Sequence, residues 1–354
     1  MLRLLTPNSR LFLVARTREK ALEAAHAVDS VFASGQEKSS ENKSVANDLY
    51  AQQSLKFERD CNGKKTIFPM VCDHSSFDSV RTFCQEMKNE LRLLSEIEGY
   101  QIGIDVLCLN AAVLLGADAD VQYTEDNLEL TIQTNHFSPF LIANSLFEYI
   151  NVGARVVVTS SGLHAFESFG SFEGVFDPET GKIEDKFEMI NGNDYHYKKC
   201  YAVSKLCNVA FCLELNRRLK ERNAKAICFS PGLIPTSGLF KHQKQWDDTV
   251  VKKLGIGMGE SEEWGGLMLV WMAVSEKAYL EGGCYWKAPL GISKRGGKIP
   301  DDLFLESLSK EVTSCENRER LWRISSTLTG LTHRRLSDSS KNSSKDVFIS
   351  SSVR

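Results

Sequence analysis

The residues best suited to acid–base chemistry are Tyr201 and Lys205, four positions apart in the segment YAVSK. On a helix this spacing places both side chains on one face. A tyrosine titrates at about pH 10, so its phenol becomes a useful proton donor at neutral pH when a nearby cation stabilises the phenolate. Lys205 would supply that cation. Such a pair also occurs on ordinary solvated helix faces, so its meaning depends on the surrounding sequence.

Two apolar runs end in small polar residues. One is VVVTSS, which ends at Ser161, and the other is LCLNAA, which contains Asn110 and Ala111. Ligands of doubly wound sheets bind at the carboxyl ends of the strands, so both ends are predicted to border one crevice. Asn135 follows in TNH, on the helix predicted after the second run.

The elements that would position these residues alternate between short apolar strands and amphipathic helices. This alternation predicts an α/β fold, a doubly wound, Rossmann-like parallel sheet covered by helices on both faces. Strands are predicted over 11–16, 66–72, 104–110, 154–160, 224–230 and 284–288. Helices are predicted over 19–28, 77–96, 125–150, 197–222, 262–274 and 307–328.

The remaining segments set the domain boundaries. We predict one domain over 1–330, with a polar surface insertion at about 30–65 and a disordered Ser-rich tail over 331–354. Residues 1–18 contain four arginines and no acid. That composition is also typical of an organelle-targeting peptide, but the apolar run at 11–16 favours a core strand.

Composition excludes several classes of function. The 354 residues carry 43 Lys plus Arg against 46 Asp plus Glu, which disfavours a nucleic-acid partner. No apolar run is long enough for a transmembrane helix. The ten cysteines include no C-x-x-C pair and His74, His136 and His164 share no ligand spacing, so neither a disulfide framework nor a metal site is predicted.

Four motifs occur in the order typical of the short-chain dehydrogenase/reductase family. These are the Asn-Ala-Ala at 110–112, the helix asparagine Asn135, the strand-end Ser161, and Tyr201 with Lys205. Within that family, segments such as DVLCLNAAV, TNHFSPFLIANSLF and SPGLIPTSGLF resemble the light-dependent protochlorophyllide reductases over about 11–331. The stretched interval between Ser161 and Tyr201 also occurs in retinol-dehydrogenase-like members, and the Thr-Ser-Ser-Gly strand end resembles theirs.

The resemblance implies an NADPH-dependent enzyme in which Tyr201 delivers the proton that accompanies a hydride. Lys205 would lower the pKa of Tyr201 and hold the nicotinamide ribose. Ser161 would orient or polarise the substrate, and Asn135 would hold a water that links Lys205 to solvent.

The resemblance also implies a set of cofactor contacts. Arg16 and Lys20 match the cations that select the adenosine 2′-phosphate, and Asp73 matches the residue that touches adenine. The other contacts would be Asn110 and Ala111 on the adenosine side, and Pro231, Gly232, Ile234 and Thr236 over the nicotinamide. The substrate would be a large planar or apolar small molecule. Peripheral membrane contact stays open, the oligomeric state is not predicted, and the location would be the chloroplast, or otherwise the cytoplasm.

Two departures keep alternatives open. The family's T-G-x-x-x-G-x-G phosphate turn does not occur before Arg16, so the first strand and its glycine-rich loop are expected to be missing. Leu233 stands where protochlorophyllide reductases have a cysteine in the closing loop. The alternatives are therefore a retinol-dehydrogenase-like carbonyl or alcohol oxidoreductase and a catalytically inactive binding protein.

Overall fold

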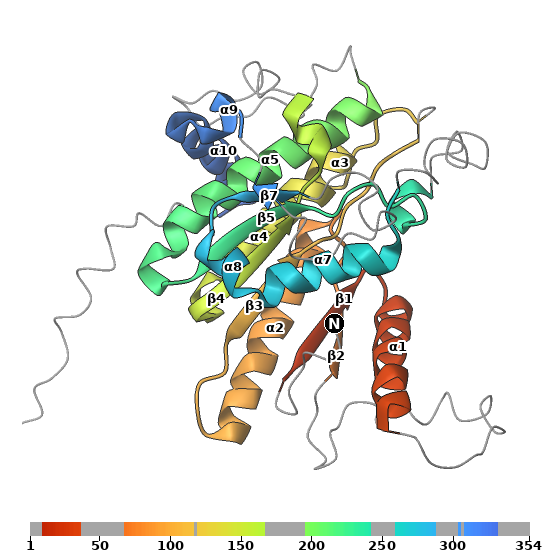
Figure 1. The fold of residues 1–354 in the computed structure, drawn as a ribbon, viewed down its shortest axis with the longest axis vertical. Helices are drawn as coiled ribbons and strands as arrows, with labels where there is room; N and C mark the ends of the chain where they lie inside the picture. Colours follow the sequence, from red (N-terminus) through yellow and green to blue (C-terminus); the bar gives the residue numbers. More distant parts are fainter. Residues whose placement is uncertain are drawn as a thin grey trace, which may run out of the picture.

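The computed structural model describes residues 9–36, 67–116, 119–166, 195–241, 259–287, 304–305 and 308–331. They form an α/β fold in which helices cover both faces of parallel strands (Figure 1). The first helix, α1 (Arg18–Gln36), runs into the segment predicted as a surface insertion. The rest of that insertion, and the predicted tail from residue 332 onward, lie outside the described residues.

The strands form two sheets. β1 (Leu11–Ala15) and β2 (Ile67–Val71) pair in parallel. The larger sheet has the order β3-β4-β5-β6-β7, and its first four strands are parallel. Its strands are β3 (Ile104–Leu109), β4 (Ile150–Thr159), β5 (Lys225–Ser230), β6 (Tyr285–Lys287) and β7 (Phe304–Leu305). The parallel fold predicted from the sequence is confirmed, whereas the antiparallel β7 was not predicted.

β1 and β3 each have one open edge in the described part of the chain, because they pair with β2 and β4 but not with each other. Their apolar side chains are correspondingly exposed, at 44% for Val14 and 39% for Val106. Strands of a covered parallel sheet are normally buried on both faces. The central strand β5 meets that expectation, since all its residues after Lys225 are buried.

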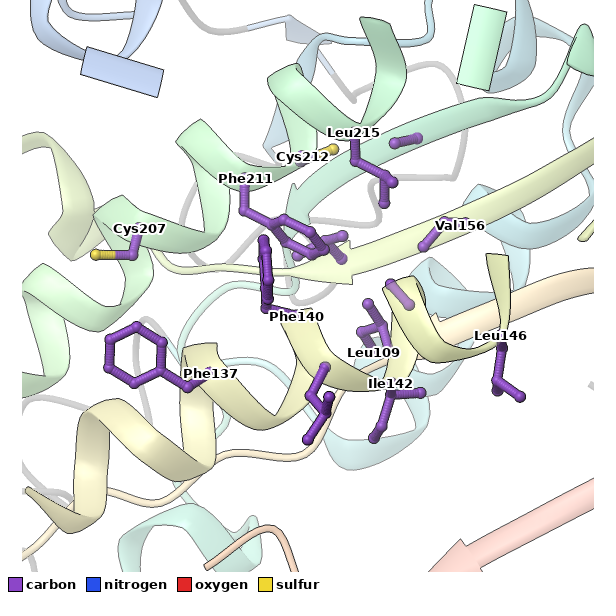
Figure 2. Packing of buried hydrophobic residues seen from close by; sticks show 14 of the residues in the cluster. Leu109, Phe137, Phe140, Ile142, Leu146, Val156, Cys207, Phe211, Cys212 and Leu215 are labelled. Atoms are coloured by element: carbon purple, nitrogen blue, oxygen red, sulfur yellow. The ribbon is translucent and has the colours of Figure 1, made fainter. Parts of the chain in front are cut away.

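Alternate residues of β4 point to opposite faces of the sheet and belong to two different buried clusters. Val156 and Val158 belong to one buried cluster with α2 (Phe77–Glu98), α4 (Ser138–Ser145) and α5 (Tyr197–Arg218), whereas Val157 belongs to another with α7 (Glu262–Val274). Figure 2 shows the first layer, where Phe140 of α4 and Phe211 of α5 lie 5.5 Å apart between their ring centroids. α5 is therefore fixed directly over β4.

The helix predicted over 125–150 is too long, because the chain is helical without interruption only over 130–145. The chain instead forms α3 (Leu130–Ile132), the π-helical turn η2 (Gln133–Phe137), α4, and the 3-10 turn η3 (Phe147–Tyr149). Asn127 adopts a left-handed φ of 59°, which no helix interior accepts. The start is set by Glu129, whose carboxylate accepts hydrogen bonds from the backbone N–H groups of Thr131 and Ile132.

The predicted terminal helix divides into α9 (Lys310–Thr313) and α10 (Cys315–Leu328). Ser314 separates them, because its extended backbone and its hydroxyl cap the start of α10. α10 packs on α5, where the Arg218 guanidinium lies 4.0 Å from the ring centroid of Trp322. α5 is thus covered by β4 on one side and by α10 on the other.

The short elements are η4 (Gly162–Phe166), η6 (Leu219–Arg222), η7 (Gly238–Phe240) and α8 (Glu276–Leu280). Within the described ranges, no helix combines the length with the apolar character that crossing a bilayer requires.

Candidate functional site

The predicted site residues follow the carboxyl ends of parallel strands. Arg16 follows β1, Asp73 follows β2, Asn110 follows β3, and Ser161 and Pro231 follow β4 and β5. Because β3, β4 and β5 are parallel neighbours, their three ends lie at one edge of the larger sheet. This edge is where doubly wound sheets bind ligands.

Tyr201 and Lys205, predicted from the sequence to be catalytic, lie close together in the structure and are called the catalytic pair below. Both lie on α5 and are buried, and the Lys205 ammonium is 5.5 Å from the centroid of the Tyr201 ring. Lys205 Nζ donates a hydrogen bond of 3.2 Å to the carbonyl of Thr159, the last residue of β4. The structure therefore brings both side chains to the end of β4.

Burial sets the protonation of the catalytic pair. It raises the pKa of Tyr201 to about 12, against an opposing hydrogen bond with the Ser161 side chain. It lowers the pKa of Lys205 to about 8. The sequence predicted that Lys205 would lower the pKa of Tyr201, but the pKa is raised. Desolvation of the phenolate is the larger effect. At neutral pH the phenol holds its proton and the lysine is mainly charged.

The hydroxyl groups of Thr159 and Ser160 join the end of β4 to its neighbours. The sequence alone predicted no role for either residue. Thr159 Oγ1 donates to Asn110 Oδ1 at 2.8 Å and so joins the ends of β4 and β3. Ser160 Oγ donates to the carbonyl of Lys205 at 2.8 Å and joins β4 to α5. Both residues lie in VVVTSS directly before Ser161, and this position at a strand end could have indicated them as site residues.

Asn135 lies in the π-helical turn and clamps the loop that follows β3. Its Oδ1 accepts from the Val113 N–H at 2.8 Å, and its Nδ2 donates to the Val113 carbonyl and to Ser204 Oγ, each at 3.0 Å. These bonds hold the loop against α5. They do not test the expected water-holding role, which stays a prediction.

The predicted adenosine contacts lie on the open side of the site. Arg16 and Lys20 are exposed, in the link after β1 and in the first turn of α1. Asn110 and Ala111 are also exposed, at the end of β3. Asp73 is half-buried, and its carboxylate accepts hydrogen bonds from Ser75.

The loop after β5 depends on a glycine. Gly232 has φ of +88°, and a Cβ built there would lie 3.2 Å from Glu260 Cγ. Pro231 and Ile234 are half-buried and Thr236 is exposed. Gly265 of α7 lets Ile234 approach, because a Cβ on that glycine would collide with the tip of the Ile234 side chain. α7 therefore supports this loop from behind.

An apolar wall surrounds the Tyr201 side chain. Its buried members, besides Tyr201, are Leu114, Leu115 and Tyr197, and the half-buried Leu239 and Phe240 of η7 pack against them. The described residues contain no group of three or more His, Cys, Asp or Glu side chains that could hold a metal ion. The arrangement provides a buried proton donor, an adjacent cation and an apolar surface.

No family model matches the chain. The protochlorophyllide reductase, chloroplastic, of Marchantia paleacea is 29% identical over 285 residues, which is 73% of this chain and 56% of that protein. Retinol dehydrogenase 14 of Mus musculus is 33% identical over 168 residues, which is 47% of this chain and 42% of that protein.

A crystal structure of an uncharacterized protein from Mycobacterium paratuberculosis superimposes with a TM-score of 0.53. It is 19% identical and covers 90% of this chain and 83% of its own, so the likeness supports the fold alone. The chain spans less than two thirds of the length of the two curated relatives named above.

Proposed function

Because the chain is a member of the short-chain dehydrogenase/reductase family, we propose that it is an NADPH-dependent oxidoreductase. The observation that carries the proposal is the catalytic pair, which is buried on α5 beside Ser161 at the carboxyl edge of the sheet. NADPH, when bound, supplies the hydride. The chain's own residues supply and stabilise the proton that accompanies it.

Tyr201 is the proton donor in this mechanism. Its raised pKa keeps the phenol protonated, and its hydrogen bond with Ser161 points both hydroxyls at one place, where a substrate oxygen or carbon would lie. Lys205 would stabilise the phenolate left behind, since its ammonium lies on the same helix face. Thr159 keeps that ammonium in position through its carbonyl.

The residues present fit NADPH at its two ends. Arg16 and Lys20 are exposed cations suited to a 2′-phosphate, and Asn110 with Ala111 leaves the end of β3 open to an adenosine group. Gly232 allows the loop after β5 to turn beside a nicotinamide.

As substrate we propose a tetrapyrrole of the protochlorophyllide type, reduced at a carbon–carbon double bond. The apolar wall supports a large planar molecule, and the similarity to the Marchantia paleacea enzyme extends over 73% of the chain. The plant relatives are named as chloroplastic, and we extend that location, with a role in chlorophyll formation, to this chain.

A second candidate is a carbonyl or alcohol oxidoreductase of the retinol-dehydrogenase type. Leu233 favours it, because a leucine side chain has no proton to give to a carbon. Ser161 and Tyr201 together are sufficient to bind a carbonyl oxygen. The third candidate is a binding protein without catalysis.

The test replaces Tyr201 by Phe and assays NADPH oxidation with protochlorophyllide under illumination and with retinal in darkness. Turnover should fall at least about a hundredfold, as for loss of a positioned proton donor. Tyr100→Phe is the matched control, since Tyr100 is 61% exposed at the opposite end of α2. Near-normal turnover by the Tyr201→Phe variant would contradict the proposal that Tyr201 is the proton donor.

The two substrates separate the candidates. Illuminated protochlorophyllide reduction supports the first candidate, and dark retinal turnover alone supports the second. The wild-type protein turning over neither substrate supports the third.

A further inference from the structure

Lys287 is a cation of the candidate site that the sequence did not single out. It ends β6 and lies opposite Ser230, the last residue of β5. In the strand order, β6 is on the far side of β5 from β3, which carries Asn110. Lys287 therefore borders the carboxyl edge of the sheet away from the predicted adenosine contacts.

The Lys287 side chain reaches back across the sheet edge toward Ser161. Its Nζ lies 3.9 Å, and its Cε 3.8 Å, from the position of a Cβ built on Gly162. Gly162 begins η4 and directly follows Ser161, so the ammonium lies beside the turn that carries Ser161.

A neighbouring contact fixes the orientation of β6. Tyr285, two residues before Lys287, points to the same face of the strand. Its ring lies 4.5 Å from the ring of His164, which is also in η4, and the two rings meet edge to face. Tyr285 and Lys287 thus face one turn, the turn that presents Ser161 to the catalytic pair.

We propose that Lys287 binds a carboxylate of the substrate and selects an apolar molecule that carries one acidic group. The inference rests on the proposed function, since it concerns the substrate of the same site. The apolar wall covers Tyr201 on the side of η7 and of the loop after β3, while Lys287 lies beyond Gly162. A molecule placed at Ser161 would therefore meet an apolar surface and an ammonium, which forms charge-assisted hydrogen bonds with carboxylates.

The first experiment measures binding to the full 354-residue protein without turnover. The probes are 1-pyrenebutyrate and its methyl ester, a flat apolar pair that differs in the acidic group and is followed by pyrene fluorescence. The wild-type protein should bind the acid at least about tenfold more tightly than the ester. Lys287→Met should abolish that preference and leave ester binding unchanged, whereas Lys287→Arg should retain most of it.

Lys220→Met is the matched control, because Lys220 is exposed in η6, directly after the far end of α5, and should not alter the preference. Thermal melting of each variant shows whether it is folded, and Lys287→Gln, which also removes the charge, repeats the test if Lys287→Met is not. Equal wild-type affinity for acid and ester, no measurable binding of the acid, or an unchanged acid preference in folded Lys287→Met would overturn the inference.

A second experiment keeps this inference separate from the proposed function. It compares turnover of protochlorophyllide with that of the ester of its propionate group. Turnover that is indifferent to the ester and to Lys287→Met overturns the role of Lys287 and leaves the oxidoreductase standing. Acid-selective binding without any turnover overturns the oxidoreductase and leaves the carboxylate site standing.

Discussion

Replacing Lys205 by Met should stabilise the protein while it impairs catalysis. Lys205 is among the most deeply buried charged side chains of the described residues, and burial lowers its pKa from 10.5 to about 8. At 1.36 kcal/mol for each tenfold change in proton affinity, this lowering corresponds to a burial penalty of about 3 kcal/mol for the ammonium. Methionine fills nearly the same volume without a charge. The Thr159 carbonyl would keep its bond from Asn208 Nδ2 at 3.4 Å.

The expected gain is about 2 to 3 kcal/mol in the free energy of unfolding at pH 7. Its pH dependence has a definite sign. Between about pH 8 and 10.5 the unfolded chain still protonates Lys205 while the folded protein does not, so wild-type stability contributed by this group rises with pH. The advantage of Lys205→Met should therefore shrink across that interval. Because both proteins contain Tyr201, its titration cancels in the difference between their free energies of unfolding.

The assay is urea denaturation of both proteins at pH 7 and pH 10, followed by tryptophan fluorescence. Lys220→Met, at an exposed position, should match wild type within about 0.5 kcal/mol. A Lys205→Met protein that is less stable than wild type at pH 7, or an advantage that does not shrink at pH 10, would refute the reasoning. Turnover should fall in the same variant, since the phenolate of Tyr201 would lose its cation.

Three further outcomes are expected. Replacing Arg16 and Lys20 together by Gln should reduce the preference for NADPH over NADH by roughly 1 to 3 kcal/mol, measured by cofactor titration; an unchanged preference would make them surface residues. Burial lowers the pKa of His136 to about 3, so only the unfolded chain protonates it between its usual 6.5 and that value. Stability should fall on acidification from pH 7 to 4, and His136→Gln should remove part of that fall in denaturation curves. Gly232→Ala should destabilise by about 1 to 3 kcal/mol in urea because φ is +88°, whereas Gly266→Ala, on the open face of α7, should be neutral or stabilising.

Local sequence patterns were sufficient for strands β1 to β6 and for the helix of the catalytic pair. The strands are short apolar runs with clear polar ends, and α5 begins at the predicted Tyr197. The same patterns could not reveal that the helix predicted over 125–150 begins only at Leu130 and contains a π-helical turn. The late start accompanies the φ of 59° at Asn127, and the turn contains Asn135, which bonds to Val113, distant in sequence.

The sequence could predict only those site residues that lie in a recognisable motif or at the end of a predicted strand. The motif around Ser161 and Tyr201 marks residues that the structure then brings together. The contact between Lys287 and Gly162 joins positions more than a hundred residues apart, and nothing in the local sequence YWK distinguishes that lysine from a surface one. The pKa of Tyr201 likewise follows from tertiary burial, which spacing on a helix cannot supply.

The bond between His136 and Ser325 determines when the site can be completed during synthesis. The imidazole Nε2 lies 3.0 Å from Ser325 Oγ, across 189 positions of sequence. His136 is the neighbour of Asn135, and Trp322 of the same terminal helix packs on Phe140 and Phe211. A ribosome must therefore release residues beyond 325 before the helices around Tyr201 acquire their last partner. Contacts of such long range slow folding and leave apolar helix faces uncovered meanwhile, so the nascent chain should depend on chaperones until α10 has emerged.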